Sequence, residues 1–145
     1  MSYKTIVVHV DQSRTAVGRV AYAAQLARAH GAHLTGLHPV SPFQIPAYSE
    51  VAISAEIIDK LQAQGEADAK QAKATFAEAT ERAGVPGEWR RLDGDPVELT
   101  ALNARYADVV IVGQEDPDEF VPGVPSAFAE RLVFAMGRPA IVLPY

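Results

Sequence analysis

The sequence predicts an α/β protein in which a parallel β-sheet carries helices on both faces. Two observations indicate this class. Short apolar runs rich in Ile and Val recur along the chain, and segments with a helical spacing of apolar residues separate them. The first run, Lys4–Val10, does not alternate strictly between apolar and polar residues, which is typical of a strand buried on both faces. The predicted order is strand and helix in strict alternation, beginning and ending with a strand.

The first strand, Lys4–Val10, ends at Asp11, where a turn leads into the first helix. We expect Ser13 to be the N-cap of that helix. Apolar residues recur along it at a spacing of three or four, and Gly31 stands where it should end. Those apolar residues are Ala16, Val20, Ala23, Ala24 and Ala27. The second strand is predicted over His33–Val40.

A stiff loop and a long helix are predicted next. The loop is indicated by Pro39, Pro42 and Pro46. The helix ends at Gly84 and Pro86, and its apolar stripe consists of Ile58, Leu61, Gly65, Ala69, Ala72, Phe76, Ala79 and Ala83. We interpret the charges on its other face as solvated; they are Glu66, Asp68, Lys70, Lys73, Glu78 and Glu81. A partner-binding coiled coil is the less favoured alternative, because the stripe is mostly small alanine.

The remaining elements follow turn and cap signals. A third strand over Glu88–Leu92 holds the only tryptophan. Asp95 is the expected N-cap of the next helix, with Pro96 at its first position. The fourth strand is predicted over Val109–Val112 and ends at Gly113. A proline-containing loop then leads to the last helix and strand, predicted over Ala127–Met136 and Ala140–Leu143.

Composition excludes several classes of function. The 145 residues are the length of one domain, which we place over residues 1–145. The absence of cysteine excludes disulfides, thiolate metal sites and a cysteine nucleophile. Eighteen acids against 13 bases give a net charge of −5, which argues against binding to nucleic acid or to an anionic membrane. No apolar run suits a signal peptide or a membrane span, so we expect a cytoplasmic protein.

Ligands of open parallel sheets bind beyond the carboxyl ends of the strands. Two loops are expected there, Asp11–Ser13 and Gly113–Ser126, and each precedes a helix whose N-terminus suits a phosphate. Neither a GxxxxGK[ST] motif nor a GxGxxG motif is present, which excludes a standard P-loop and a standard dinucleotide site.

Four segments match one known family in order and spacing. They are residues 4–11 (KTIVVHVD) with Ser13, residues 29–36 (AHGAHLTG), residues 107–113 (ADVVIVG) and residues 137–144 (GRPAIVLP). With these segments the chain resembles the universal stress protein family over essentially its whole length. The resemblance implies a three-layer α/β/α sandwich of the adenine nucleotide alpha hydrolase-like type, with a five-stranded parallel sheet in the order 3-2-1-4-5.

The resemblance also implies where a nucleotide would bind. Many members bind ATP through an aspartate after the first strand and a phosphate-cradling motif, G-x2-G-x9-G-[ST], after the fourth. Asp11 matches the aspartate and Gly113 the first glycine, but Asp116, Ser126 and Ala127 stand where the motif has its other glycines and its hydroxyl residue. The candidate remnant of the nucleotide pocket is therefore Asp11, Ser13, Gly113 and Ser126.

Charge near this remnant argues against a phosphate ligand. Residues 115–119 contain four acids, Glu115, Asp116, Asp118 and Glu119. At roughly 0.5 kcal/mol for each exposed like charge, they cost about 2 kcal/mol against a triphosphate, or about 30-fold in affinity. We therefore predict no cofactor and no usual ATP binding. The alternative is a member that binds ATP or AMP and hydrolyses ATP weakly.

The residues indicate neither an enzyme nor a metal site. No serine lies in a G-x-S-x-G elbow, and Ser13 has no evident histidine base. We expect His9 and His38, on neighbouring strands, to be packed rather than catalytic. Asp11 has a second interpretation, as a cap of the first helix. No third metal ligand can be named beside His30 and His33, and the acids of the loop are interpreted as solvated.

The last strand suggests a partner. Ala140, Ile141, Val142 and Leu143 are apolar and, in the implied order, form a sheet edge that invites pairing. The resemblance implies a homodimer through this edge, or a pseudo-dimer with a second universal stress domain. Residues 88–90 (EWR), 113–117 (GQEDP) and 137–139 (GRP) look like the N-terminal half of tandem members. We expect a non-enzymatic stress-response module that acts through protein contacts.

Overall fold

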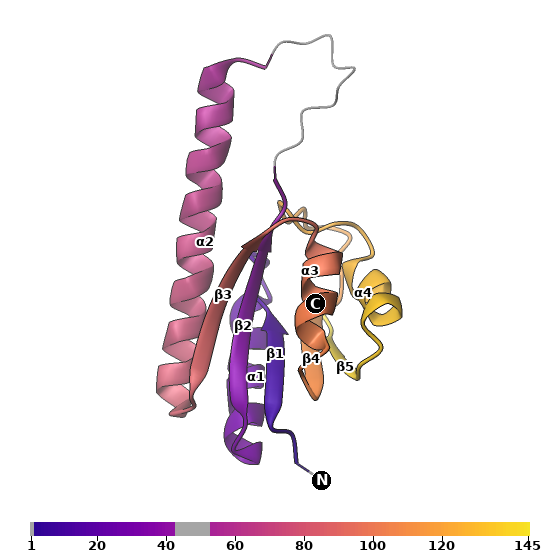
Figure 1. Cartoon of the computed structure of the whole chain (residues 1–145). Coiled ribbons are helices and arrows are strands. Elements are labelled where there is room, and N and C mark those ends of the chain that lie inside the picture. Colours follow the sequence, from indigo (N-terminus) through magenta and orange to yellow (C-terminus); the bar gives the residue numbers. More distant parts are fainter. Residues whose placement is uncertain (1, 43–52) are drawn as a thin grey trace.

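The computed structural model describes residues 2–42 and 53–145 and contains a five-stranded parallel sheet in the order β3-β2-β1-β4-β5 (Figure 1). The strands are β1 (Thr5–His9), β2 (His33–Val40), β3 (Gly87–Asp93), β4 (Val109–Gly113) and β5 (Ala140–Leu143). The helices are α1 (Ala16–His30), α2 (Ala55–Ala83), α3 (Pro96–Ala104) and α4 (Phe128–Met136). The predicted fold class and strand order are confirmed. Pro46 of the predicted loop lies outside the described residues.

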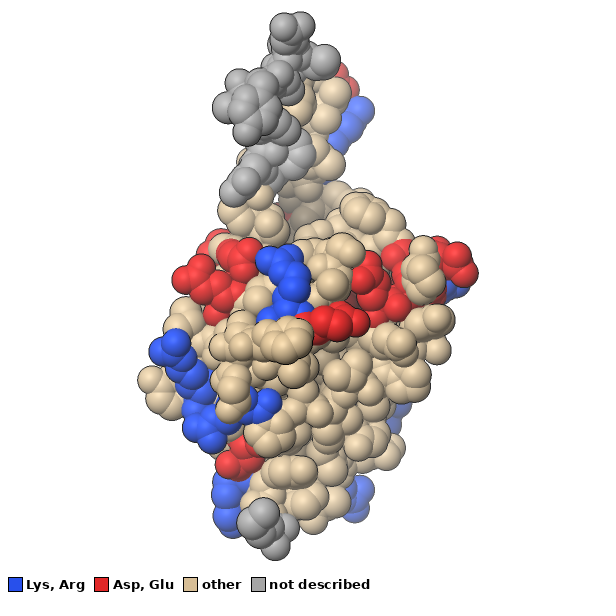
Figure 2. All heavy atoms as spheres, turned by 90° about the vertical axis from the view of Figure 1, so that its right-hand side faces the viewer, with Lys and Arg blue, Asp and Glu red and all other residues tan. Residues whose placement is uncertain are grey.

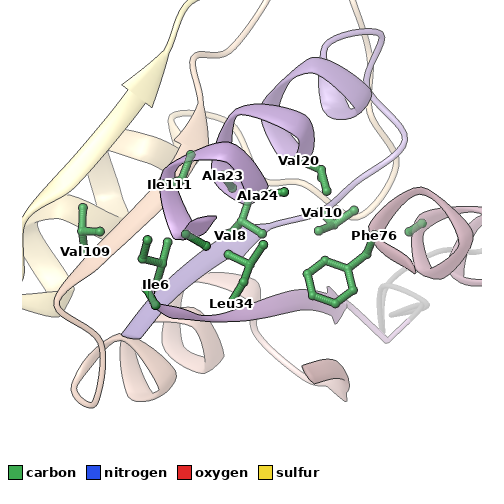
Figure 3. Close-up of a cluster of buried hydrophobic side chains, with 13 residues drawn as sticks. Ile6, Val8, Val10, Val20, Ala23, Ala24, Leu34, Phe76, Val109 and Ile111 are labelled. Carbon is green, nitrogen blue, oxygen red and sulfur yellow. The ribbon is translucent and has the colours of Figure 1, made fainter. Parts of the chain in front are cut away.

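The two faces of the sheet carry separate hydrophobic clusters. Helices α1 and α2 pack together on one face, and α3 and α4 pack together on the other. Within β1, Ile6 and Val8 enter the α1/α2 cluster while Val7 enters the α3/α4 cluster. Figure 3 shows Val8 between Ile6 and Val10, beneath the alanines of α1. A strand with both faces buried needs apolar residues at successive positions, which explains the uninterrupted run in the sequence.

The predicted boundaries differ from the structure mainly by one residue. Gly31, Gly84 and Gly137 follow their helices in the left-handed conformation, with φ of 60° to 65°, as expected of helix C-caps. Asp95 caps α3 by accepting a hydrogen bond from the Glu98 N–H at 2.8 Å. Ser13 is not the N-cap of α1, because Thr15 holds that position.

Helix α2 is longer than the sheet it covers. Its 29 residues span about 44 Å, whereas the eight residues of β2 span about 26 Å. Only the second half of its stripe reaches the core, through Ala69, Ala72 and Phe76, while Leu61 is 45% exposed. The Phe76 ring fits against β2 because Gly36 has no side chain: a Cβ there would lie 2.5 Å from the ring. Figure 1 shows the first half of α2 extending beyond the strands.

One charge on α2 is not simply solvated. Glu66 receives two hydrogen bonds from Arg91 of β3, at 2.6 and 2.8 Å. This pair joins the helix to the edge strand near the place where the helix leaves the sheet. Glu66 is still 67% exposed, so it remains a solvated charge that in addition pairs with the edge strand.

Candidate functional site

The candidate pocket lies at the carboxyl ends of β1 and β4, which are neighbours in the sheet. The structure brings together all four residues that the sequence singled out: Asp11, Ser13, Gly113 and Ser126 line one cavity. The cavity has a volume of about 170 Å³, and its apolar wall includes Phe120 and Phe128. The four predicted residues therefore meet at one place in the fold.

Arg19 is the residue of the pocket that the sequence analysis missed. It is 3% exposed, and it donates from Nη2 to Asp11 Oδ1 at 2.7 Å and from Nε to the His9 carbonyl at 2.9 Å. A signal for it existed. Arg19 lies three residues after Ala16 and four before Ala23, within the apolar face of α1. A charged residue there must be buried, and a buried charge needs a partner.

Gly113 is explained by this arginine. A Cβ at position 113 would collide with the Arg19 guanidinium, which lies against the end of β4. The absence of a side chain therefore creates room for an internal cation. Gly113, which the resemblance matched to the first glycine of a phosphate-cradling motif, makes space for arginine in this structure.

Asp11 closes a tight turn ahead of α1. Its Oδ1 accepts hydrogen bonds from the Ser13 N–H at 2.9 Å and from the Ser13 hydroxyl at 2.5 Å, in addition to the bond from Arg19. An aspartate that bonds to the backbone two residues on forms an Asx turn. This bonding corrects both helix-cap interpretations: Ser13 donates to Asp11 instead of capping α1, and Asp11 serves the turn before the helix.

Burial sets the charge of His9, and neighbouring groups set the charge of Asp11. Burial lowers the pKa of His9 to about 4, with Arg19 and His38 acting in the same direction and Asp11 opposing them. Burial alone would raise the pKa of Asp11, but His9, Arg19 and the Ser13 hydrogen bonds together lower it to about 2. At neutral pH His9 is uncharged and Asp11 is ionised. The charge partner of Asp11 is therefore Arg19.

Both strand histidines are packed, as expected. The His9 ring lies 4.5 Å from the Phe128 ring between centroids, and its Nδ1 lies 3.6 Å from Asp11 Oδ2. The Nδ1 of His38 is 2.7 Å from the Val10 carbonyl oxygen, and its ring stacks on Trp89 at 5.9 Å.

The loop after β4 turns back over this end of the sheet. Arg14, which follows β1, lies 2.6 Å from Asp116 and 3.5 Å from Glu119 through its guanidinium. The Glu115 carboxylate accepts the Ala127 N–H at 2.7 Å and the Ser126 hydroxyl at 3.2 Å. Three of the four acids are thus engaged within the chain. Their interpretation as solvated charges is wrong for Asp116 and Glu119, which are mostly buried, while Glu115 and Asp118 are exposed.

Within residues 2–42 and 53–145, no group of three or more His, Asp or Glu side chains is placed to hold a metal ion. Over the same residues, no helix combines the length and apolar character that crossing a membrane requires.

Comparison with known proteins places this chain in a family. A model of the universal stress protein family matches residues 2–120, while no curated protein sequence matches the chain. Among solved structures, the chain is similar to universal stress protein UspA from Lactobacillus plantarum, with 20% identity over 99% of each chain and a TM-score of 0.72. It is also similar to a universal stress family protein from Burkholderia pseudomallei, with 25% identity, coverage of 99% of this chain and 97% of that chain, and a TM-score of 0.65.

A third similar structure is the universal stress protein from Archaeoglobus fulgidus in complex with dAMP. It has 22% identity over 98% of each chain and a TM-score of 0.63. The family model covers well over half of the 145 residues. The chain therefore belongs to the universal stress protein family.

Proposed function

We propose that this chain is a non-enzymatic stress-response module that acts in the cytoplasm through protein contacts and does not bind ATP in the usual way of its family. The observation that carries the proposal is that Asp11 is already hydrogen-bonded within the chain. Its Oδ1 already receives three hydrogen bonds, one of them from the buried Arg19. A ribose hydroxyl that donated to Oδ1 would have to compete with this internal ion pair, and breaking a buried pair costs about 3 kcal/mol or more.

The size of the cavity supports the same proposal. Pockets for small organic ligands usually measure about 300–1,000 Å³, and this cavity has about 170 Å³. The residues present do not fit a nucleotide held in the family's arrangement. Arg19 fills the space beside Gly113, and Glu115 holds the backbone N–H at the start of α4.

A nucleotide-binding function is the second candidate, supported by the similar Archaeoglobus fulgidus structure, which is described as a complex with dAMP. For this chain it requires residues 114–126 to move away and Arg19 to release Asp11. The two candidates therefore differ in a measurable way, namely in whether nucleotide stabilises the native protein.

Thermal unfolding of the full chain with ATP, ADP and AMP, with and without magnesium, tests the proposal. A ligand present at 100 times its Kd stabilises the native state by about 2.7 kcal/mol, which is roughly 5–10 °C in Tm for a chain of this size. We expect no shift beyond that of magnesium with pyrophosphate, and no phosphate release from ATP. Calorimetric binding of ATP with a Kd below about 10 μM, or ATP hydrolysis above background, contradicts the proposal.

We further propose that the β5 edge pairs with a second copy of the chain or with a second universal stress domain. Val142 of β5 is 43% exposed, and Phe134 of the neighbouring α4 is 91% exposed. Figure 2 shows an area without Lys, Arg, Asp or Glu over the centre and right of the face that carries α4 and β5, below a mostly acidic band, while basic groups line the left side of the view. The opposite edge strand, β3, carries Glu88, Arg90, Arg91 and Asp93, which are charges of the kind that block edge pairing.

A further inference from the structure

The loop between β4 and α4 is fastened at two places by its own acidic side chains. We call residues 114–126 the acidic loop. One fastening joins it to the start of α4, and the other joins it to Arg14 in the turn after β1. The Arg14 contacts join residues 102 and 105 positions apart, so they are tertiary and hold the loop against the rest of the fold, whereas Glu115 and Ala127 are 12 positions apart.

The first fastening places a carboxylate where helices of this kind attract anions. Glu115 Oε2 accepts the Ala127 N–H at 2.7 Å, one residue before α4 begins, and Oε1 accepts the Ser126 hydroxyl at 3.2 Å. Free N–H groups and the helix dipole favour negative charge at that point. Ala127 adopts φ 54° and ψ 36°, and it is the only non-glycine residue with positive φ in the described part of the chain.

The second fastening covers two acids with one arginine. The Arg14 side chain is 66% exposed, whereas the side chains of Asp116 and Glu119 beneath it are 15% and 16% exposed. The Arg14 backbone N–H also donates to Glu119 Oε1 at 2.9 Å. Asp116 in turn accepts the Asp118 N–H at 2.9 Å, which fixes the bend of the loop. Arg14 therefore holds the loop through both its backbone and its side chain.

We propose that the acidic loop is a self-latched cover: Glu115 acts as an internal anion at the start of α4, and Arg14 locks the loop over the end of the sheet. The closed state then forms without any ligand. A phosphate-bearing molecule has no role in ordering this loop, because the protein supplies the negative charge itself. This proposal rests on the proposed function, in which no nucleotide occupies the pocket, but the closed loop itself can be tested without nucleotide.

Amide hydrogen exchange, measured by mass spectrometry on the full chain, tests the latch. Arg14→Gln removes the guanidinium, and Glu115→Gln removes the charge while keeping the shape. Arg82→Gln and Glu78→Gln are matched controls, because these residues form an exposed ion pair within α2. We expect the two latch variants to exchange about fivefold faster at residues 114–127 than wild type, which is the effect of losing about 1 kcal/mol. The controls should leave this segment unchanged.

Inorganic phosphate serves as the probe of the internal anion. In Glu115→Gln, phosphate should restore protection at residues 126–128, whereas chloride at equal ionic strength should not. In wild type, phosphate should not change the exchange of residues 126–128, because the Glu115 carboxylate already occupies this position. Equal protection of wild type and variant by phosphate, or unchanged exchange at residues 114–127 in Arg14→Gln and Glu115→Gln, overturns the latch. Tight ATP binding by wild type instead overturns the proposed function, whatever the exchange rates show.

Discussion

Lowering the pH from 7 to 5 should destabilise the protein through His9. The pKa of this buried imidazole is lowered to about 4 in the native state, against 6.5 in the unfolded chain. Between pH 7 and pH 5, His9 therefore binds a proton in the unfolded state but stays mostly unprotonated in the native state. Stability contributed by the neutral ring is fully present above pH 6.5 and is lost as the pH falls towards 4.

The two pKa values set the magnitude. At pH 5 an unfolded histidine is almost fully protonated while native His9 remains mostly neutral, so the free energy of unfolding falls by about 2 kcal/mol between pH 7 and pH 5. Asp11 adds nothing in that interval. Its pKa is lowered from 3.8 to about 2, so its contribution of about 2 kcal/mol is lost only as the pH falls from about 4 to about 2.

Urea unfolding followed by circular dichroism at pH 7 and pH 5 measures the effect. His9→Gln should remove about 2 kcal/mol of the pH dependence, whatever its cost in absolute stability. His33→Gln is the matched control, because His33 also lies on a strand but its side chain is 44% exposed, and it should leave the contribution of His9 intact. The reasoning would be refuted if wild type and His9→Gln lost the same free energy of unfolding between pH 7 and pH 5. It would also be refuted if an NMR titration gave His9 a pKa above 6.

Three further predictions concern stability and assembly. Arg19→Met should cost about 3 kcal/mol in urea unfolding, because it leaves a buried carboxylate unpaired; a cost below about 1 kcal/mol contradicts the ion pair. Gly36→Ala should cost about 2 kcal/mol through overlap with an aromatic ring. By contrast, Gly65→Ala, which meets nothing within 4 Å inside α2, should stabilise by about 1 kcal/mol; equal effects would show that packing is not the cause. Val142→Lys should convert a dimer to a monomer in sedimentation, while Ile57→Lys on α2 should not; an unchanged dimer in the first variant excludes the β5 edge.

The positions of most strands and helices were predictable because their signals are local, whereas the strand order was implied by the family resemblance. Apolar runs without alternation gave the strands, and glycines in left-handed positions marked the helix ends, as Gly31 and Gly137 show. The extent of burial along α2 was not predictable in the same way. Ile58 and Ala72 satisfy the same periodicity, but only a residue that lies over the sheet becomes core, and the length of the sheet is a tertiary property.

The meeting of the candidate residues was predictable from the sequence, but the bonds that they make were not. Asp11 and Gly113 follow strands that become neighbours, so their meeting follows from the topology. The ion pair with Arg19 and the bond from Glu115 to Ala127 join residues on different elements. From the sequence, the acids of the loop were interpreted as charges that repel a phosphate. In the structure, Glu115, Asp116 and Glu119 form hydrogen bonds or ion pairs within the chain. The sequence shows which residues are charged, but the partner of each charge depends on how the elements pack.

The position of the single tryptophan decides what its fluorescence can report. Trp89 lies on edge strand β3, with its ring stacked on His38 and 5.6 Å from the Phe76 ring of α2 between centroids. Its fluorescence emission will therefore change when α2 detaches from the sheet, because the ring then loses its contact with Phe76. It does not line the cavity beyond β1 and β4. A silent tryptophan signal during a ligand titration would thus carry no information about that cavity.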